Sequence, residues 1–144
     1  MIQTERIVEL LREGLQDTEA QVESSGSGFI DISDPSAKDG RLITLLIRGD
    51  SDIEVAIHVP NKKGSPFEQT FAGAAEDSQA LEAEVTRFVV GLVTEQVVLG
   101  KERGIFKGGR RFLPASELGP ATQRRLSWVV SWRGSFDNFC SRRI

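Results

Sequence analysis

Residues 29–59 read FIDISDPSAKDGRLITLLIRGDSDIEVAIHV, and this stretch decides the fold. Apolar and polar residues alternate over residues 53–59, which is typical of a half-buried strand. Residues 41–48 are rich in Leu and Ile on both faces and predict a central strand, and residues 29–33 predict a third strand. Short segments rich in Asp, Gly and Ser separate the three strands. We therefore expect an antiparallel meander.

A helix is expected before this meander and a long loop after it. Thr4 can cap a helix that ends near Glu23, because apolar residues recur at helical spacing along it. Residues 61–76 lack a regular pattern and contain two glycines and a proline. Phe67 and Phe71 are the residues that should anchor this loop to the body of the protein.

A second helix is predicted to begin near Asp77 or Ser78 and to end at Gly100. Its apolar stripe consists of Leu81, Val85, Phe88, Val89, Leu92, Val93 and Val97. The later part of this segment is rich in β-branched residues. A strand over residues 96–99 is therefore the alternative.

The remaining chain is expected to form a hairpin over residues 105–113, a strand over residues 126–133 and a short tail. Residues 114–123 between them are expected to form a loop with one helical turn. Together these elements predict a single domain over residues 1–144 in the α+β class. Its mostly antiparallel sheet would hold the meander, the hairpin and the C-terminal strand, with the two main helices on one face.

The charge of the chain changes sign along its length. Residues 1–100 hold 8 Lys/Arg against 18 Asp/Glu, a formal balance of −10, and residues 101–144 hold 10 against 3, a balance of +7. Such a split indicates either a basic recognition surface or internal neutralisation. The residues predicted to bind a partner are Arg103, Lys107, Arg110, Arg111, Trp132 and Arg133. Trp132 is expected to be more exposed than Trp128, because the strand breaks at Gly134.

No catalytic, metal or cofactor site is predicted. His58 shares a strand face with Glu54, but a surface position explains this histidine better than a general base does. The acidic turn over residues 50–54 lacks the pattern of a calcium loop, and the glycines of residues 100–109 form no phosphate-binding motif. Cys140 is the single cysteine and is expected to be a packed, inert residue.

The sequence indicates a cytoplasmic protein without a membrane partner. It offers no disulfide, no apolar run of about 20 residues and no secretion signal. We expect a small, bacterial-type, non-catalytic protein-binding module of the immunity-protein or secretion-chaperone kind, because the chain is a compact acidic α+β domain with bipolar charge and no convincing catalytic constellation. Its expected element order is also loosely similar to that of secretion chaperones of the helix–three-strand–helix type. A nucleic-acid-binding accessory protein that uses the basic segment 101–133 is the alternative. A third hypothesis is an enzyme or small-ligand protein built around His58 and the loop over residues 61–76, and a homo-oligomer is possible.

Overall fold

The computed structural model describes residues 2–49, 51–73, 77–104 and 109–140. Contacts divide the chain into two compact units, unit 1 (residues 1–90) and unit 2 (residues 91–144). The charge divides near the same boundary. Unit 1 carries 8 Lys/Arg against 17 Asp/Glu, a balance of −9, and unit 2 carries 10 against 4, a balance of +6. The single domain over residues 1–144 stays a prediction.

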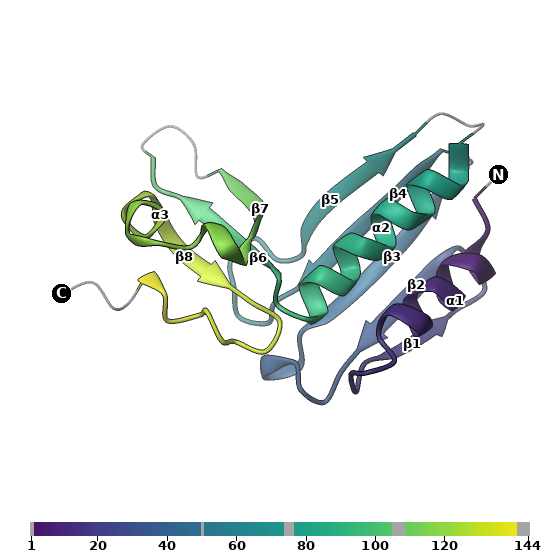
Figure 1. The fold of residues 1–144 in the computed structure, drawn as a ribbon, viewed down its shortest axis with the longest axis horizontal. Coiled ribbons are helices and arrows are strands. Elements are labelled where there is room, and N and C mark those ends of the chain that lie inside the picture. The colour runs from purple at the N-terminus through teal and green to yellow at the C-terminus, as the bar shows by residue number, and fades with distance from the viewer. Residues whose placement is uncertain (1, 50, 74–76, 105–108, 141–144) are drawn as a thin grey trace. The chain divides into compact units, whose positions relative to one another are not determined.

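Unit 1 is built on an antiparallel sheet in which each strand pairs with the next one in sequence (Figure 1). Its five strands are β1 (Gln21–Ser24), β2 (Phe29–Ser33), β3 (Leu42–Arg48), β4 (Asp52–His58) and β5 (Phe67–Ala72). A 3-10 turn, η1 (Lys38–Gly40), lies between β2 and β3. The predicted meander β2–β3–β4 is confirmed, with β3 in the middle of the sheet.

One face of this sheet, the inner face, carries the core of unit 1. Leu45 of β3 is fully buried and pairs with Ile30 of β2 and Val55 of β4. Helices α1 (Thr4–Gly14) and α2 (Ser78–Val93) both lie over this face, as the sequence predicts (Figure 1). The helices approach closely, since a Cβ atom added at Gly14 would lie 2.8 Å from Val90 Cγ2. The opposite, outer face mixes polar residues such as Thr44 and Glu54 with half-buried leucines such as Leu46.

The first helix is shorter than the sequence predicts. It ends at Gly14 instead of Glu23, and the chain turns through residues 15–20 into β1. Thr18 stabilises this turn, because its hydroxyl donates to Leu15 O at 2.7 Å and accepts from Ala20 N at 3.1 Å. Val22, which continues the apolar spacing of the helix, is instead a buried residue of β1.

The long loop predicted over residues 61–76 contains the edge strand β5. Phe67 is buried, and the ring of Phe71 lies 5.1 Å from that of Phe88 on α2, so both residues anchor the segment as expected. Residues 74–76 lie outside the described residues. The alternation of Phe67, Gln69 and Phe71 on the inner face is that of a strand, but the polar Gln69 conceals it in the sequence.

Unit 2 contains a second antiparallel sheet, in the order β7–β6–β8. The strands are β6 (Val97–Glu102), β7 (Arg110–Pro114) and β8 (Leu126–Val130). A 3-10 turn, η3 (Ala115–Glu117), and helix α3 (Pro120–Arg125) connect β7 to β8. One face of the sheet packs into a core that consists of Val98, Leu113, Leu126, Val129 and Cys140.

The α+β class and the antiparallel pairing are confirmed, but the strands form two sheets instead of the one sheet that the sequence predicts. The helix predicted to reach Gly100 ends at Val93, so the alternative strand is the correct one and extends to Glu102. The hairpin predicted over residues 105–113 is correct only in its second arm, which is β7; this strand pairs with β6, which precedes the predicted hairpin, and residues 105–108 lie outside the described residues. The C-terminal strand ends at Val130 instead of residue 133. Helix α3 occupies a segment expected to be a loop.

Candidate partner-binding site

Cations gather at one end of the unit 2 sheet. This cluster, the basic end, consists of Lys101, Arg103, Arg110, Arg111, Arg124 and Arg125. Strand β6 pairs antiparallel with both neighbours, so its last residues meet the first residues of β7 and β8. Lys101 pairs with Arg110 on one side and with Trp128 on the other. The backbone N–H of Arg103 donates to Arg125 O at 2.7 Å, which brings the last turn of α3 to the same place.

Internal contacts engage some of these cations and leave others exposed. Arg111 Nε donates to Glu102 Oε1 at 2.9 Å, and Arg103 Nε donates to Leu126 O at 3.1 Å. The last two residues of α3, Arg124 and Arg125, are exposed. Within the part of the chain that the structure describes, neither side chain has an ion-pair partner. The basic end therefore presents positive charge to solvent.

The residues predicted to bind a partner separate into groups. Arg103, Arg110 and Arg111 belong to the basic end, whereas Lys107 lies outside the described residues. Arg133 lies near the opposite end of β6, where its Nε atom is 3.4 Å from Glu95 Oε1. The length of β6, about 20 Å at 3.3–3.4 Å per residue, separates these two positions. Lys101, Arg124 and Arg125 were not among the predicted residues.

The expected exposure of the two tryptophans is reversed. Trp132 is only 1% exposed, so it is not available for docking, while Trp128 is half-buried beside Lys101. The reason lies in the turn after β8. Glu95 holds the backbone N–H groups of Arg133 and Ser135 at 3.1 and 3.2 Å, and this fold-back keeps the chain against the body of unit 2.

Glu95 is the important residue that sequence reasoning missed. Its carboxylate is buried and accepts hydrogen bonds from Arg133 N, Ser135 N and Ser135 Oγ. Burial raises the pKa of Glu95, but hydrogen bonds from Ser135, Ser131 and Arg133 outweigh it and hold the pKa below its ordinary value. The network continues through Ser131, whose N–H donates to Asp137 Oδ1 at 3.1 Å. We assign Glu95 a structural role, because its oxygens are used to fix a turn.

The other sequence candidates have contacts that explain them without chemistry. Glu54 lies 2.9 Å from Arg48 in an ion pair, so this carboxylate is engaged away from His58. Cys140 is buried, and its Sγ donates to Leu126 O at 3.4 Å. Burial raises the pKa of the Cys140 thiol and exceeds the opposing effect of the Arg103 charge. The expectation of a packed cysteine is confirmed.

No group of His, Cys, Asp and Glu side chains among the described residues could hold a metal ion. No helix within residues 2–49, 51–73, 77–104 and 109–140 has the length and hydropathy needed to cross a bilayer.

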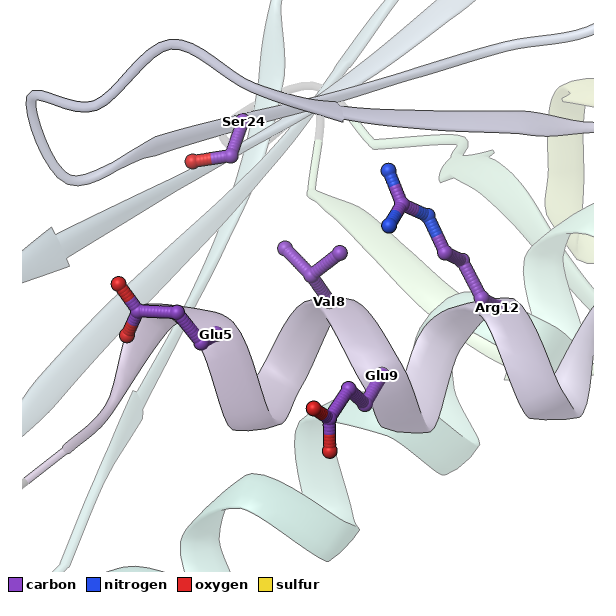
Figure 2. Close-up of a pocket in the computed structure, with 5 residues that line it drawn as sticks. All are labelled: Glu5, Val8, Glu9, Arg12 and Ser24. Atoms are coloured by element: carbon purple, nitrogen blue, oxygen red, sulfur yellow. The ribbon is translucent and has the colours of Figure 1, made fainter.

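Unit 1 has a surface pocket of ≈ 390 Å³ between α1 and β1, lined by Glu5, Val8, Glu9, Arg12 and Ser24 (Figure 2). Arg12 extends from the helix towards the strand, and its Nη2 donates to Val22 O at 2.9 Å (Figure 2). Glu9 points away from the strand in this view. Arg12 is the one cation among the five lining residues, and its guanidinium already has a partner.

Comparison with family models, curated proteins and solved structures finds no match. Among the described residues, the basic end is the strongest candidate site.

Proposed function

We propose that this chain is a non-catalytic protein-binding module, in which the basic end docks an acidic surface of a partner protein. The observation that carries the proposal is the exposed pair Arg124 and Arg125 at the same end of the unit 2 sheet as Lys101 and Arg110, on a unit whose balance is +6. Immunity proteins and secretion chaperones are examples of modules of this kind. Complementary charge accelerates encounter and selects partners, even where each exposed pair adds little affinity.

The basic end is an ordered part of the fold and not a solvated tail, which favours a role in recognition. The arginines belong to β7, α3 and the connection that follows β6, and backbone pairing fixes these elements. A partner would therefore meet a preorganised set of cations and would order few side chains on binding. Arg103 and Arg111 are already held by Leu126 O and Glu102, which limits the entropy that they could still lose.

The test is affinity capture on the immobilised chain from native lysate that has been treated with nuclease. We expect the double charge reversal Arg124→Glu/Arg125→Glu to reduce recovery of the captured protein about tenfold, as two lost contacts of about 0.7 kcal/mol each imply. The matched control is Lys62→Glu/Lys63→Glu, which changes the net charge equally but lies on unit 1. Equal losses in both variants, or no nuclease-resistant partner for the wild type, would contradict the proposal.

Binding to single-stranded nucleic acid is the second candidate, because the half-buried Trp128 pairs with Lys101 on a strand that also pairs Lys101 with Arg110. Interleaved aromatic and basic side chains are typical of such platforms. The probe is a fluorescent 20-nucleotide oligo-dT, measured by anisotropy over a salt series. A steep salt slope that Arg110→Glu/Arg111→Glu abolishes would favour this candidate. Unchanged oligo-dT binding by that variant would exclude this candidate.

A further inference from the structure

The two edges of the unit 1 sheet are protected to different degrees. An edge strand presents unpaired N–H and C=O groups that can pair with another chain, and proteins commonly block such edges. Edge strand β1 has only four residues. The side chain of Arg12 donates to Val22 O on its open side, and α1 runs alongside it (Figure 2). The β1 edge is thus short and blocked.

The β5 edge has neither protection. It has six residues, contains no proline, lysine or arginine, and pairs along its full length with β4. Glu68, Gln69 and Thr70 are exposed. In the sheet order of the described residues, β5 has no neighbour on its other side.

One hydrogen bond fixes the direction of the β5 backbone groups. Gly73 N donates to Ser51 O at 3.1 Å, and this pair continues the β4–β5 register. Since backbone groups alternate between the two sides of a strand, the odd-numbered residues of β5 direct their N–H and C=O groups towards β4. The backbone N–H and C=O groups of Glu68, Thr70 and Ala72 therefore point away from β4, towards the open edge. We call these three the outward-facing residues.

We propose that the β5 edge pairs with the β5 edge of a second copy of this chain, which joins two unit 1 sheets into one continuous antiparallel sheet. In an antiparallel pair with two-fold symmetry, outward-facing residues must oppose outward-facing residues. Centring the axis on Thr70 satisfies this condition for every outward residue. Thr70 then opposes Thr70 of the second copy, and Glu68 opposes Ala72.

Side-chain chemistry favours this register over one centred on Glu68. Opposed threonines are a favourable cross-strand pair, whereas a register centred on Glu68 would oppose two carboxylates. With Thr70 at the axis, the two Glu68 residues are about 13 Å apart along the strands, beyond the screening length of about 8 Å in physiological salt. On the inner face, the half-buried Phe71 rings of the two copies become diagonal neighbours, which aromatic side chains can bridge.

The test measures molar mass by light scattering over a protein concentration series from about 1 µM to 1 mM, the range of a small and weak interface. The wild type should rise from 15.8 kDa towards twice that mass. Thr70→Lys and Thr70→Glu should each stay monomeric, because like charges then meet at the axis, and their equimolar mixture should recover the dimer. Thr44→Lys, the same substitution on the central strand β3, is the matched control and should dimerise.

Hydrogen exchange gives a second readout on the unmodified chain. The amides of Glu68, Thr70 and Ala72 should exchange quickly at low concentration and slow at least tenfold at high concentration, while the odd-numbered amides of β5 stay protected throughout. A wild type that stays monomeric at 1 mM, or a Thr70→Lys variant that dimerises as the wild type does, would overturn the proposal. Arg124→Glu/Arg125→Glu should dimerise normally, so failure at the basic end and failure at this edge are distinguishable.

Discussion

In unit 1 every strand pairs with its neighbour in sequence, whereas in unit 2 the central strand β6 pairs with β7 and with the more distant β8. The inner face of unit 1 buries a ladder of aliphatic side chains from consecutive strands, beneath two helices. Unit 2 instead has a small apolar cluster and fixes its turns with buried or half-buried polar contacts. These contacts involve Glu95, Thr122, Gln123, Ser131 and Asp137.

The contrast follows from size. A segment of about 54 residues buries a smaller share of its surface than one of about 90 residues, so apolar burial alone leaves it less stable. Fully satisfied polar networks fix conformation where the core is small, but a network that loses a member is costly. Unit 1 should therefore be sensitive to lost apolar volume, and unit 2 to the loss of single polar groups.

The largest effect is expected for Leu45→Ala in unit 1. Leu45 is fully buried between Ile30 and Val55, and truncation should lower the free energy of unfolding by about 3 kcal/mol, within the usual range of about 2–5. The matched control is Leu46→Ala on the half-exposed outer face, for which we expect about 1 kcal/mol. Urea unfolding at neutral pH measures both values. Equal losses would show that the inner face is not the core.

Glu95→Gln should have the next largest effect, about 2 kcal/mol. The substitution removes the charge that Arg133 N, Ser135 N and the Arg133 guanidinium stabilise, while it keeps the size of the side chain. Glu102→Gln is the control in the same unit. Its pair with Arg111 is about 40% exposed, so its loss should cost less than about 1 kcal/mol. Urea unfolding of the two variants at neutral pH should therefore separate them clearly.

The same carboxylate gives a pH dependence of known sign. Since folding lowers the pKa of Glu95 below its ordinary value of 4.5, the ionised group stabilises the fold above that pH. This stabilisation is lost as the pH falls through the lowered pKa of the folded state. Between about pH 5 and pH 3, the unfolding free energy of the wild type should thus fall more steeply than that of Glu95→Gln. Parallel curves would exclude Glu95 as the cause.

The sequence predicts unit 1 better than unit 2 for a physical reason. Alternating apolar residues and short turns specify β2, β3 and β4 locally, and neighbouring strands then pair. The sequence does not predict the edge strands β1 and β5, because each has few apolar residues. In β5, for example, the polar Gln69 lies between Phe67 and Phe71. Helix α2 was recognised from its stripe, but its end was not, since the same β-branched run also favours strand β6.

The candidate site was only partly predictable. The basic segment is visible as charge, yet only pairing across β6 shows that Lys101 joins Arg110 while Arg133 lies elsewhere. Glu95 carries no sequence signal, because an acidic residue after a helix ordinarily belongs to a solvated turn. Its burial depends on residues 133–135, which are distant in sequence, and local patterns do not encode such contacts.

Glu82 in unit 1 provides a direct comparison with Glu95. It is also buried, but it accepts one hydrogen bond, from Gln3 N at 3.1 Å, and has Arg6 Nε at 3.2 Å in an ion pair without hydrogen-bond alignment. Because this carboxylate is less well satisfied, Glu82→Gln should cost no more than about 1 kcal/mol in urea unfolding. A loss larger than that of Glu95→Gln would remove the distinction between the units.

The smallest effects are expected for the surface ion pairs, Arg48–Glu54 in unit 1 and Arg111–Glu102 in unit 2. Arg48→Gln and Arg111→Gln should each change the unfolding free energy by less than about 1 kcal/mol, because solvent and salt screen exposed pairs. Thermal unfolding at about 0.05 M and 0.5 M salt measures the difference, and each variant should lose part of the salt dependence. A loss above about 2 kcal/mol for Arg111→Gln would mean that unit 2 needs this charge to fold. Arg111 could then not exchange Glu102 for an acidic partner, whereas a small loss leaves it available for binding.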